Sequence, residues 1–161
     1  MAQTTITFST DTPLTEILNH PVCRISLFED SHGKCANFTL WHSNDRGLCV
    51  FSRMHDVAER LEVGVLNFRS VTTIDEGAIS VDFEPLLVPY RGCKLVVEEA
   101  ETRLESGLKL YFQNGQDLLI LPADFPLFLA VSGGCIQDRY TTSEYPLKDY
   151  EAVELFSAVS H

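Results

Sequence analysis

The chain has 161 residues, of which 45% are hydrophobic and 22% are charged. This balance fits one globular domain over residues 1–161 and excludes wholesale disorder. The 12 lysines and arginines are outnumbered by 23 aspartates and glutamates, which gives a formal net charge of −11. Because nucleic acids and anionic membranes are bound through clustered cations, this charge argues against both as direct partners. It is compatible with a cationic protein partner, or with nothing beyond solubility.

The N-terminal stretch MAQTTITFST lacks the basic and apolar regions of a signal peptide. No apolar run approaches the roughly 18 residues that a membrane span needs. The five cysteines are scattered without a C-x-x-C pair, which favours buried thiols in a reducing compartment over disulfides. We therefore expect a cytoplasmic protein.

The first third of the chain predicts short strands and one helix. Weak alternation predicts a strand over residues 4–10. A helix is expected near 13–19, because Pro13 suits the first helical position and the apolar residues that follow share one helical face. The next strands are expected over 22–28, 35–42 and 48–54, and their spacing of roughly ten residues is typical of an antiparallel meander.

Two later segments, 54–63 and 95–105, fit both a helix and a strand. Gly64 and the valines around it favour a strand from about residue 60 to 68. The pair Ser106–Gly107, which leads directly into the next apolar run, favours a strand at 95–105. Between them, residues 79–85 alternate cleanly and predict a strand with one buried face.

Asn114–Gly115 separates two apolar runs and predicts a β-hairpin with a two-residue turn. In that register Leu110 opposes Leu119, and one face becomes a core face. That face consists of Leu108, Leu110, Phe112, Leu119 and Leu121. The reverse face, with Tyr111, Leu118 and Ile120 beside Lys109, is half apolar and needs cover from this chain or from a partner.

The C-terminal stretch is the expected cover, as a possible helix near 146–158 that Pro146 opens. With the strands above, this predicts a mainly β (α+β) domain. We expect an antiparallel sheet, either a meander or a sandwich, with one or two short helices.

Five possible metal ligands fall within one short region, namely His32, Cys35, His42, Cys49 and His55. Zinc sites use closely spaced pairs, so that one turn presents two ligands, and only His32 and Cys35 are spaced in this way. Turn histidines and core cysteines explain the pattern as well. We expect neither a metal nor another cofactor.

Cys135, in the stretch SGGCIQD, is the best candidate for a catalytic nucleophile, with His42 or His55 as a base. The chain lacks the G-x-S-x-G, phosphate-loop and G-x-G-x-x-G signatures. We expect no catalytic residues and no enzyme activity. A small enzyme that depends on a cysteine or a histidine is kept as the alternative.

The densest acidic run comprises Glu98, Glu99, Glu101 and Glu105. Such a run is ordinarily a solvated face. The alternative in a chain of this net charge is a docking surface for basic side chains.

Two stretches, ERLEVGVLNF (59–68) and SGLKLYFQNGQDLLILPADFPLFLAV (106–131), resemble immunity proteins of bacterial contact-dependent growth inhibition, or polymorphic toxin, systems. The resemblance follows the hydrophobic rhythm over about half of the chain. It implies a non-catalytic cytoplasmic protein that binds and neutralises a basic toxin domain, often a nuclease. An acidic surface would steer that encounter and cover a phosphate-binding cleft.

On this interpretation, residues of two kinds are expected to bind the partner. The charged contacts are Glu98, Glu99, Glu101, Asp138 and Glu144, and the aromatic anchors are Tyr111 and Tyr140. An interaction module unrelated to toxins is the second alternative.

Overall fold

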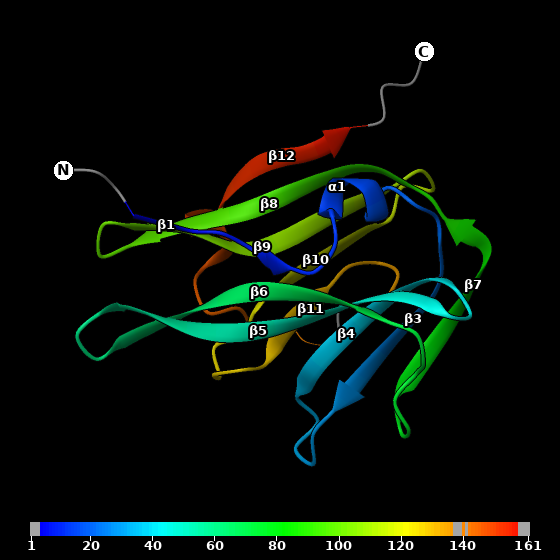
Figure 1. Ribbon diagram of the computed structural model, residues 1–161, viewed down its shortest axis with the longest axis horizontal. Coiled ribbons are helices and arrows are strands. Elements are labelled where there is room, and N and C mark those ends of the chain that lie inside the picture. Colours follow the sequence, from blue (N-terminus) through cyan, green and yellow to red (C-terminus); the bar gives the residue numbers. More distant parts are fainter. Residues whose placement is uncertain (1–3, 137–139, 141, 158–161) are drawn as a thin grey trace.

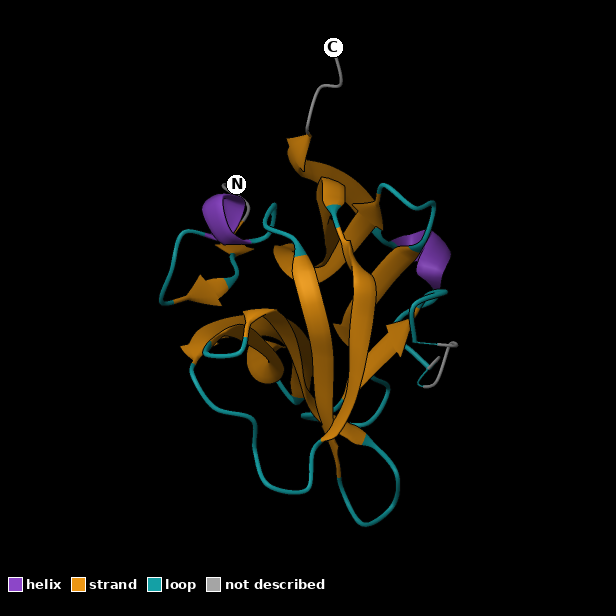
Figure 2. Cartoon of the chain, turned by 90° about the vertical axis from the view of Figure 1, so that its right-hand side faces the viewer, coloured by secondary structure: helices purple, strands orange, loops and turns teal. Residues whose placement is uncertain are grey.

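The computed structural model describes residues 4–136, 140 and 142–157. These residues form a 12-stranded curled sheet with one turn of α-helix and one turn of 3-10 helix (Figure 1). The strands are β1 (Thr4–Ile6), β2 (Ser9–Thr10), β3 (Val22–Glu29), β4 (Cys35–Ser43), β5 (Arg46–Ala58), β6 (Leu61–Val71), β7 (Ile79–Leu87), β8 (Pro89–Glu99), β9 (Thr102–Phe112), β10 (Asp117–Pro122), β11 (Leu129–Ser132) and β12 (Glu151–Ser157). The helical turns, α1 (Leu14–Ile17) and η1 (Leu147–Asp149), lie on opposite sides of the strands in Figure 2.

The sheet runs in the order β12-β8-β9-β10-β11-β4-β5-β6-β2, and β3 pairs with the other edge of β4 and carries β7. In Figure 1, β8, β9 and β10 form one side of the curl, and β5 and β6 form the facing side. The N-terminal strands link the two sides, because β1 pairs with β9 and β2 with β6. Both of these pairs are parallel, while the other strand pairs are antiparallel.

The prediction of a mainly β chain is confirmed, whereas the antiparallel meander or sandwich is not, because the sheet is mixed and curled. The helix expected near 13–19 is not confirmed either. Only the four residues of α1 are helical, and Pro13 at its N-cap provides no side-chain hydrogen bond. Leu14 and Leu18 nevertheless reach the core, so this segment contributes mainly apolar packing.

The main core lies inside the curl and draws apolar side chains from both of its sides. Residues alternate along strand β9, where Leu108, Leu110 and Phe112 are buried in this core and Lys109 and Tyr111 are partly exposed. The fully enclosed side chains of this core include Phe38, Leu40, Leu48, Val50, Leu66, Leu108, Leu110, Phe112, Leu118 and Ile120.

The β9–β10 hairpin is present, but its predicted register is wrong by one residue. Phe112 N–H donates to Gln116 O (2.9 Å) and Gly115 N–H to Phe112 O (3.0 Å), which makes a three-residue loop. Gly115 occupies the left-handed position of this loop, with φ of 88°. Leu110 therefore opposes Leu118, not Leu119.

A one-residue shift moves every side chain of the second arm to the other face. Leu118 and Ile120, and not Leu119 and Leu121, therefore join the main core. Leu121 instead belongs to a small outer cluster with Leu95 and Ala130, against which Tyr150 packs. The second arm is thus covered on both faces by this chain.

The possible helix near 146–158 is wrong where the structure describes this stretch. Only η1 is helical, and Tyr150 then takes an extended conformation that leads into β12. Strand β12 pairs antiparallel with β8, at the edge of the sheet. Its Val153 and Leu155 are half-buried and alternate with exposed glutamates, which is the period of a strand.

The two ambiguous segments are mostly strand, as we favoured, but their boundaries differ from the prediction. The strand favoured from about residue 60 begins at Leu61, and a turn at Ala100 and Glu101 interrupts the single strand favoured over 95–105. Residues 54–58 belong to β5, and β6 begins at Leu61 after a tight turn at Arg60, whose φ is 61°. Residues 95–105 are split between β8 and β9. Among the described residues, no helix has the length and apolar character needed to cross a membrane.

Candidate functional site

The predicted acidic residues lie at the tip of the β8–β9 hairpin. Its two central residues, Ala100 and Glu101, both have positive φ values of 49° and 63°. That geometry matches the right-handed twist of the strands and brings Glu98 and Glu99 close to Thr102 and Arg103 across the turn. The turn thus presents a short row of carboxylates at one end of the sheet.

These carboxylates border a hollow of about 410 Å³ that we call the acidic groove. Its lining comprises Val96, Val97, Glu98, Glu99, Tyr145, Asp149 and Glu151, and contains no lysine or arginine. Four residues that carry a carboxylate therefore line one hollow. The structure places Glu101 on the exposed turn beside the groove, outside its lining.

Two of the groove carboxylates have partners within the chain. Tyr145 Oη donates a hydrogen bond to Glu99 Oε2 (3.1 Å), and Arg103 Nη1 lies 3.9 Å from Glu151 Oε2. In the part of the chain that the structure describes, Glu98 and Asp149 take part in no ion pair. The groove thus keeps an excess of negative charge available to a cation.

Tyrosine hydroxyls near the groove stay protonated. Burial raises the pKa of Tyr145, and its hydrogen bond to Glu99 raises it further, because the carboxylate disfavours a phenolate. Burial also raises the pKa of Tyr150. Tyr145 therefore keeps the proton with which it donates a hydrogen bond to Glu99.

Glu144, an expected partner contact, is engaged within the fold. Its carboxylate accepts the N–H of Gly64 at 3.0 Å (Oε1) and 3.3 Å (Oε2), and Ser106 Oγ donates to Gly64 O at 2.7 Å. These side chains satisfy the edge of β6 where no strand pairs with it. Burial raises the pKa of Glu144 in spite of the hydrogen bond from Gly64. Glu144 therefore positions the segment before Tyr145.

The two expected aromatic anchors lie away from the acidic groove. Tyr111 sits near the other end of β9, about 30 Å along the strand from Thr102 at 3.3 Å per residue, with Arg91 and Lys109 over its ring at 5.4 and 5.0 Å. Tyr140 Oη donates to the carboxylate of Glu29. Asp138 lies outside the described residues.

The five possible metal ligands of the sequence analysis do not form one site. Cys35 and Cys49 are buried in β4 and β5, and His42 Nδ1 lies 2.9 Å from Pro21 O. No group of three histidines, cysteines, aspartates or glutamates that could hold a metal ion occurs among the described residues. Burial raises the pKa of Cys35 to about 12, so its thiol stays protonated at neutral pH.

All five cysteines are described and none is in a disulfide. Cys135, the candidate nucleophile, is 8% exposed, and its Sγ donates to Asp117 O at 3.6 Å. A nucleophilic thiol needs access and a stabilised thiolate. Its burial and its contact with a carbonyl oxygen provide neither.

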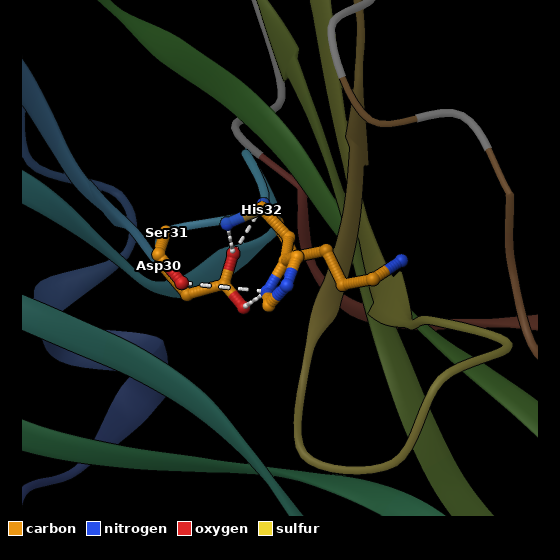
Figure 3. Close-up of polar contacts among 4 residues, drawn as sticks. Asp30, Ser31 and His32 are labelled. Atoms are coloured by element: carbon orange, nitrogen blue, oxygen red, sulfur yellow. Dashed lines mark hydrogen bonds and ion pairs between the residues drawn. The ribbon is translucent and has the colours of Figure 1, made fainter.

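A second hollow, of about 270 Å³, lies between the β3–β4 turn and the β10–β11 loop, and we call it the turn cavity. It is lined by His32, Gly33, Lys34, Cys35, Ala123, Asp124, Phe125, Phe128, Leu129, Ala130, Tyr140 and Thr142. Figure 3 shows the turn that borders it, in which the Asp30 carboxylate accepts the N–H of His32 at 3.0 Å. The same carboxylate accepts the N–H of Lys34 at 2.8 Å.

Sequence reasoning found Glu98 and Glu99 but missed Tyr145, Asp149 and Glu151. The helix expected over 146–158 does not predict that these residues lie beside β8. In the structure, β12 pairs with β8 and places Glu151 opposite Val96. Alternation at Val153 and Leu155 was the available signal. No protein-family model, no curated protein and no solved structure matches the chain.

Proposed function

We propose that this chain is a non-catalytic cytoplasmic protein that binds a cationic protein through the acidic groove. The partner expected from the sequence is a basic toxin domain, and a nuclease is the first kind to test. By binding this domain, the chain would neutralise it as an immunity protein does. The observation that carries the proposal is the convergence of Glu98, Glu99, Asp149 and Glu151 on one hollow without a lysine or arginine in its lining.

Electrostatics supports this choice of partner. A net charge of −11 repels phosphate backbones and anionic lipids, and it attracts a basic surface over distances beyond direct contact. The groove is large enough to receive the end of a lysine or arginine side chain. Glu98 and Asp149 are the residues that we assign to direct contact, because both are exposed and neither has an ion-pair partner among the described residues.

The proposal also requires rigidity, because a preformed surface loses little entropy on binding. Two contacts supply it: Tyr145 holds Glu99, and Glu144 ties the segment before Tyr145 to β6. The tight turn at Ala100 and Glu101 fixes the hairpin tip.

The test is binding to a toxin domain encoded by a neighbouring gene, identified from the genomic neighbourhood and measured by surface plasmon resonance. We expect a complex at about 1 µM or below, with an association rate that falls as salt is raised. The double variant Glu98→Gln/Asp149→Asn should lower the association rate by about tenfold.

The matched control is Asp75→Asn/Glu76→Gln, which removes the same amount of charge from an exposed loop between β6 and β7. We expect it to bind nearly as the parent does. No complex at micromolar concentration would end the proposal. Equal losses in the two double variants would remove the acidic groove as the contact site.

A further inference from the structure

The turn cavity has two walls, and both are held by backbone hydrogen bonds. On one side, Asp30 N–H donates to Lys34 O (2.9 Å) and Gly33 N–H donates to Asp30 O (3.1 Å). On the other side, Ala123 N–H donates to Phe128 O (2.9 Å) and Asp124 N–H to Thr142 O (3.2 Å). The side chains that line the cavity therefore start from defined backbone positions.

Lys34 and Asp124, which carry opposite charges, both line this cavity. Lys34 Nζ lies 4.9 Å from the centre of the Phe125 ring. Neither Lys34 nor Asp124 takes part in an ion pair with a described residue, although both line the same hollow. Two opposite charges held apart at one site suit a ligand that carries both charges itself.

The other described acidic groups nearby, Asp30 and Glu29, form no ion pair with Lys34. The carboxylate of Asp30 accepts the N–H groups of His32 and Lys34, and lies 3.6 Å from His32 Nδ1 (Figure 3). The carboxylate of Glu29 accepts the hydroxyl of Tyr140. Among the described residues, the ammonium group of Lys34 thus has no carboxylate partner.

The cavity also has an aromatic wall and a small volume. The rings of Phe125 and Phe128 lie 5.6 Å apart, and Phe125 is 52% exposed. A volume of about 270 Å³ falls just below the roughly 300–1,000 Å³ of ordinary ligand pockets. It therefore suits a ligand of the size of one amino acid.

We propose that the turn cavity binds a small zwitterion with an apolar side chain, the chemistry of a free aromatic or aliphatic amino acid. The ligand carboxylate pairs with Lys34, its ammonium group pairs with Asp124, and its side chain packs on Phe125 and Phe128. This site is separate from the acidic groove and does not depend on the proposed toxin partner.

Isothermal titration calorimetry with L-phenylalanine tests the proposal on the full chain. We expect saturable binding with a dissociation constant of about 1 mM or below. Three analogues each remove one feature: N-acetyl-L-phenylalanine lacks the ammonium group, L-phenylalaninamide lacks the carboxylate, and glycine lacks the apolar side chain. Each should bind at least about tenfold more weakly. No saturation up to about 10 mM, or equal binding of the analogues, would overturn the proposal.

Variants assign the two charges to residues. Lys34→Gln and Asp124→Asn should each weaken binding by about tenfold. The matched controls Lys148→Gln and Asp56→Asn alter exposed charges outside the cavity lining and should bind as the parent does. Unchanged affinity in both cavity variants, or equal loss in the controls, would refute the site. All four changes are at exposed or half-exposed side chains, and circular dichroism verifies that each variant is folded.

Discussion

The Asp30–Lys34 turn and the edge of β6 at Gly64 each hold a carboxylate that accepts backbone N–H groups. In the exposed turn, the hydrogen bond from Lys34 N–H is the largest influence and lowers the pKa of Asp30. At the half-buried edge, loss of water is the largest influence, and it raises the pKa of Glu144 in spite of the bond from Gly64. Solvent access, and not the hydrogen bond alone, therefore decides which protonation state the fold favours.

Each of these carboxylates also supports one candidate site without lining it. Asp30 fixes the turn that carries Lys34 to the turn cavity. Glu144 ties its part of the chain to β6 at Gly64, and the next residue, Tyr145, donates a hydrogen bond to Glu99 in the acidic groove. The comparison separates residues that position a surface from residues that can meet a ligand.

The largest expected effect on stability is steric. It compares Gly64 at the edge of β6 with Gly33 in the Asp30–Lys34 turn. A Cβ on Gly64 would lie 2.5 Å from Pro122 Cβ and 2.9 Å from Ser52 Oγ, and the proline ring cannot turn away. Gly64→Ala should therefore lower the free energy of unfolding by about 2–3 kcal/mol, measured by urea denaturation.

Its matched control is Gly33→Ala in the exposed turn. A Cβ there meets nothing within 4 Å, and the cost comes only from the positive φ of 76°. The expected loss is about 1 kcal/mol. A Gly64→Ala loss no greater than that of Gly33→Ala would show that the β6 edge is not tightly packed.

The next effect isolates the hydrogen bond to Gly64. Glu144→Ala leaves that buried N–H without an acceptor and should cost about 1–2 kcal/mol in urea denaturation. Glu144→Gln keeps an acceptor oxygen and should stay within about 0.5 kcal/mol of the parent. Glu98→Ala, on the exposed groove rim, should also change stability by less than about 0.5 kcal/mol. Equal losses in Glu144→Ala and Glu98→Ala would contradict the structural role of Glu144.

The smallest effect is a pair of opposite pH dependences. Because the folded pKa of Glu144 is raised above its ordinary 4.5, its contribution to stability is present at low pH and is lost as pH rises. Glu144→Gln should therefore gain stability relative to the parent as pH rises above that value. Urea midpoints measured across the acidic and neutral range detect this trend.

Asp30 should show the opposite trend. Its folded pKa is lowered from the ordinary 3.8, so its contribution is present above that value and is lost as pH falls. Asp30→Asn should therefore lose stability relative to the parent at neutral pH and match it in acid. Parallel trends in the two variants would mean that burial does not distinguish the two carboxylates.

Local signals in the sequence predicted most individual strands. Alternation located β3, β4 and β7, and Asn114–Gly115 located the β9–β10 hairpin. The register was missed because the same dipeptide fits both a two-residue turn and a three-residue loop with Gly115 in the left-handed position. Propensity could not decide between them.

Pairing between distant segments could not be predicted from local patterns. The parallel contacts of β1 with β9 and β2 with β6, and the pairing of β12 with β8, depend on the shape of the whole sheet. For this reason Glu98 and Glu99 were found as an acidic run, while Asp149 and Glu151 were not. Tyr111 was placed in the same expected site because sequence distance does not show that β9 carries it to the opposite end.

The links from β1 to β9 and from β2 to β6 have a consequence for biosynthesis. Residues 4–10 leave the ribosome well before their partners at 67–68 and 102–104 are translated. The two sides of the curl can be linked only after β9 has been translated. Because the paired residues are far apart in the sequence, we expect this linkage to form late in folding. Until then the nascent chain carries unpaired strand edges. Chaperones that shield such edges should therefore bind the chain mainly during this interval.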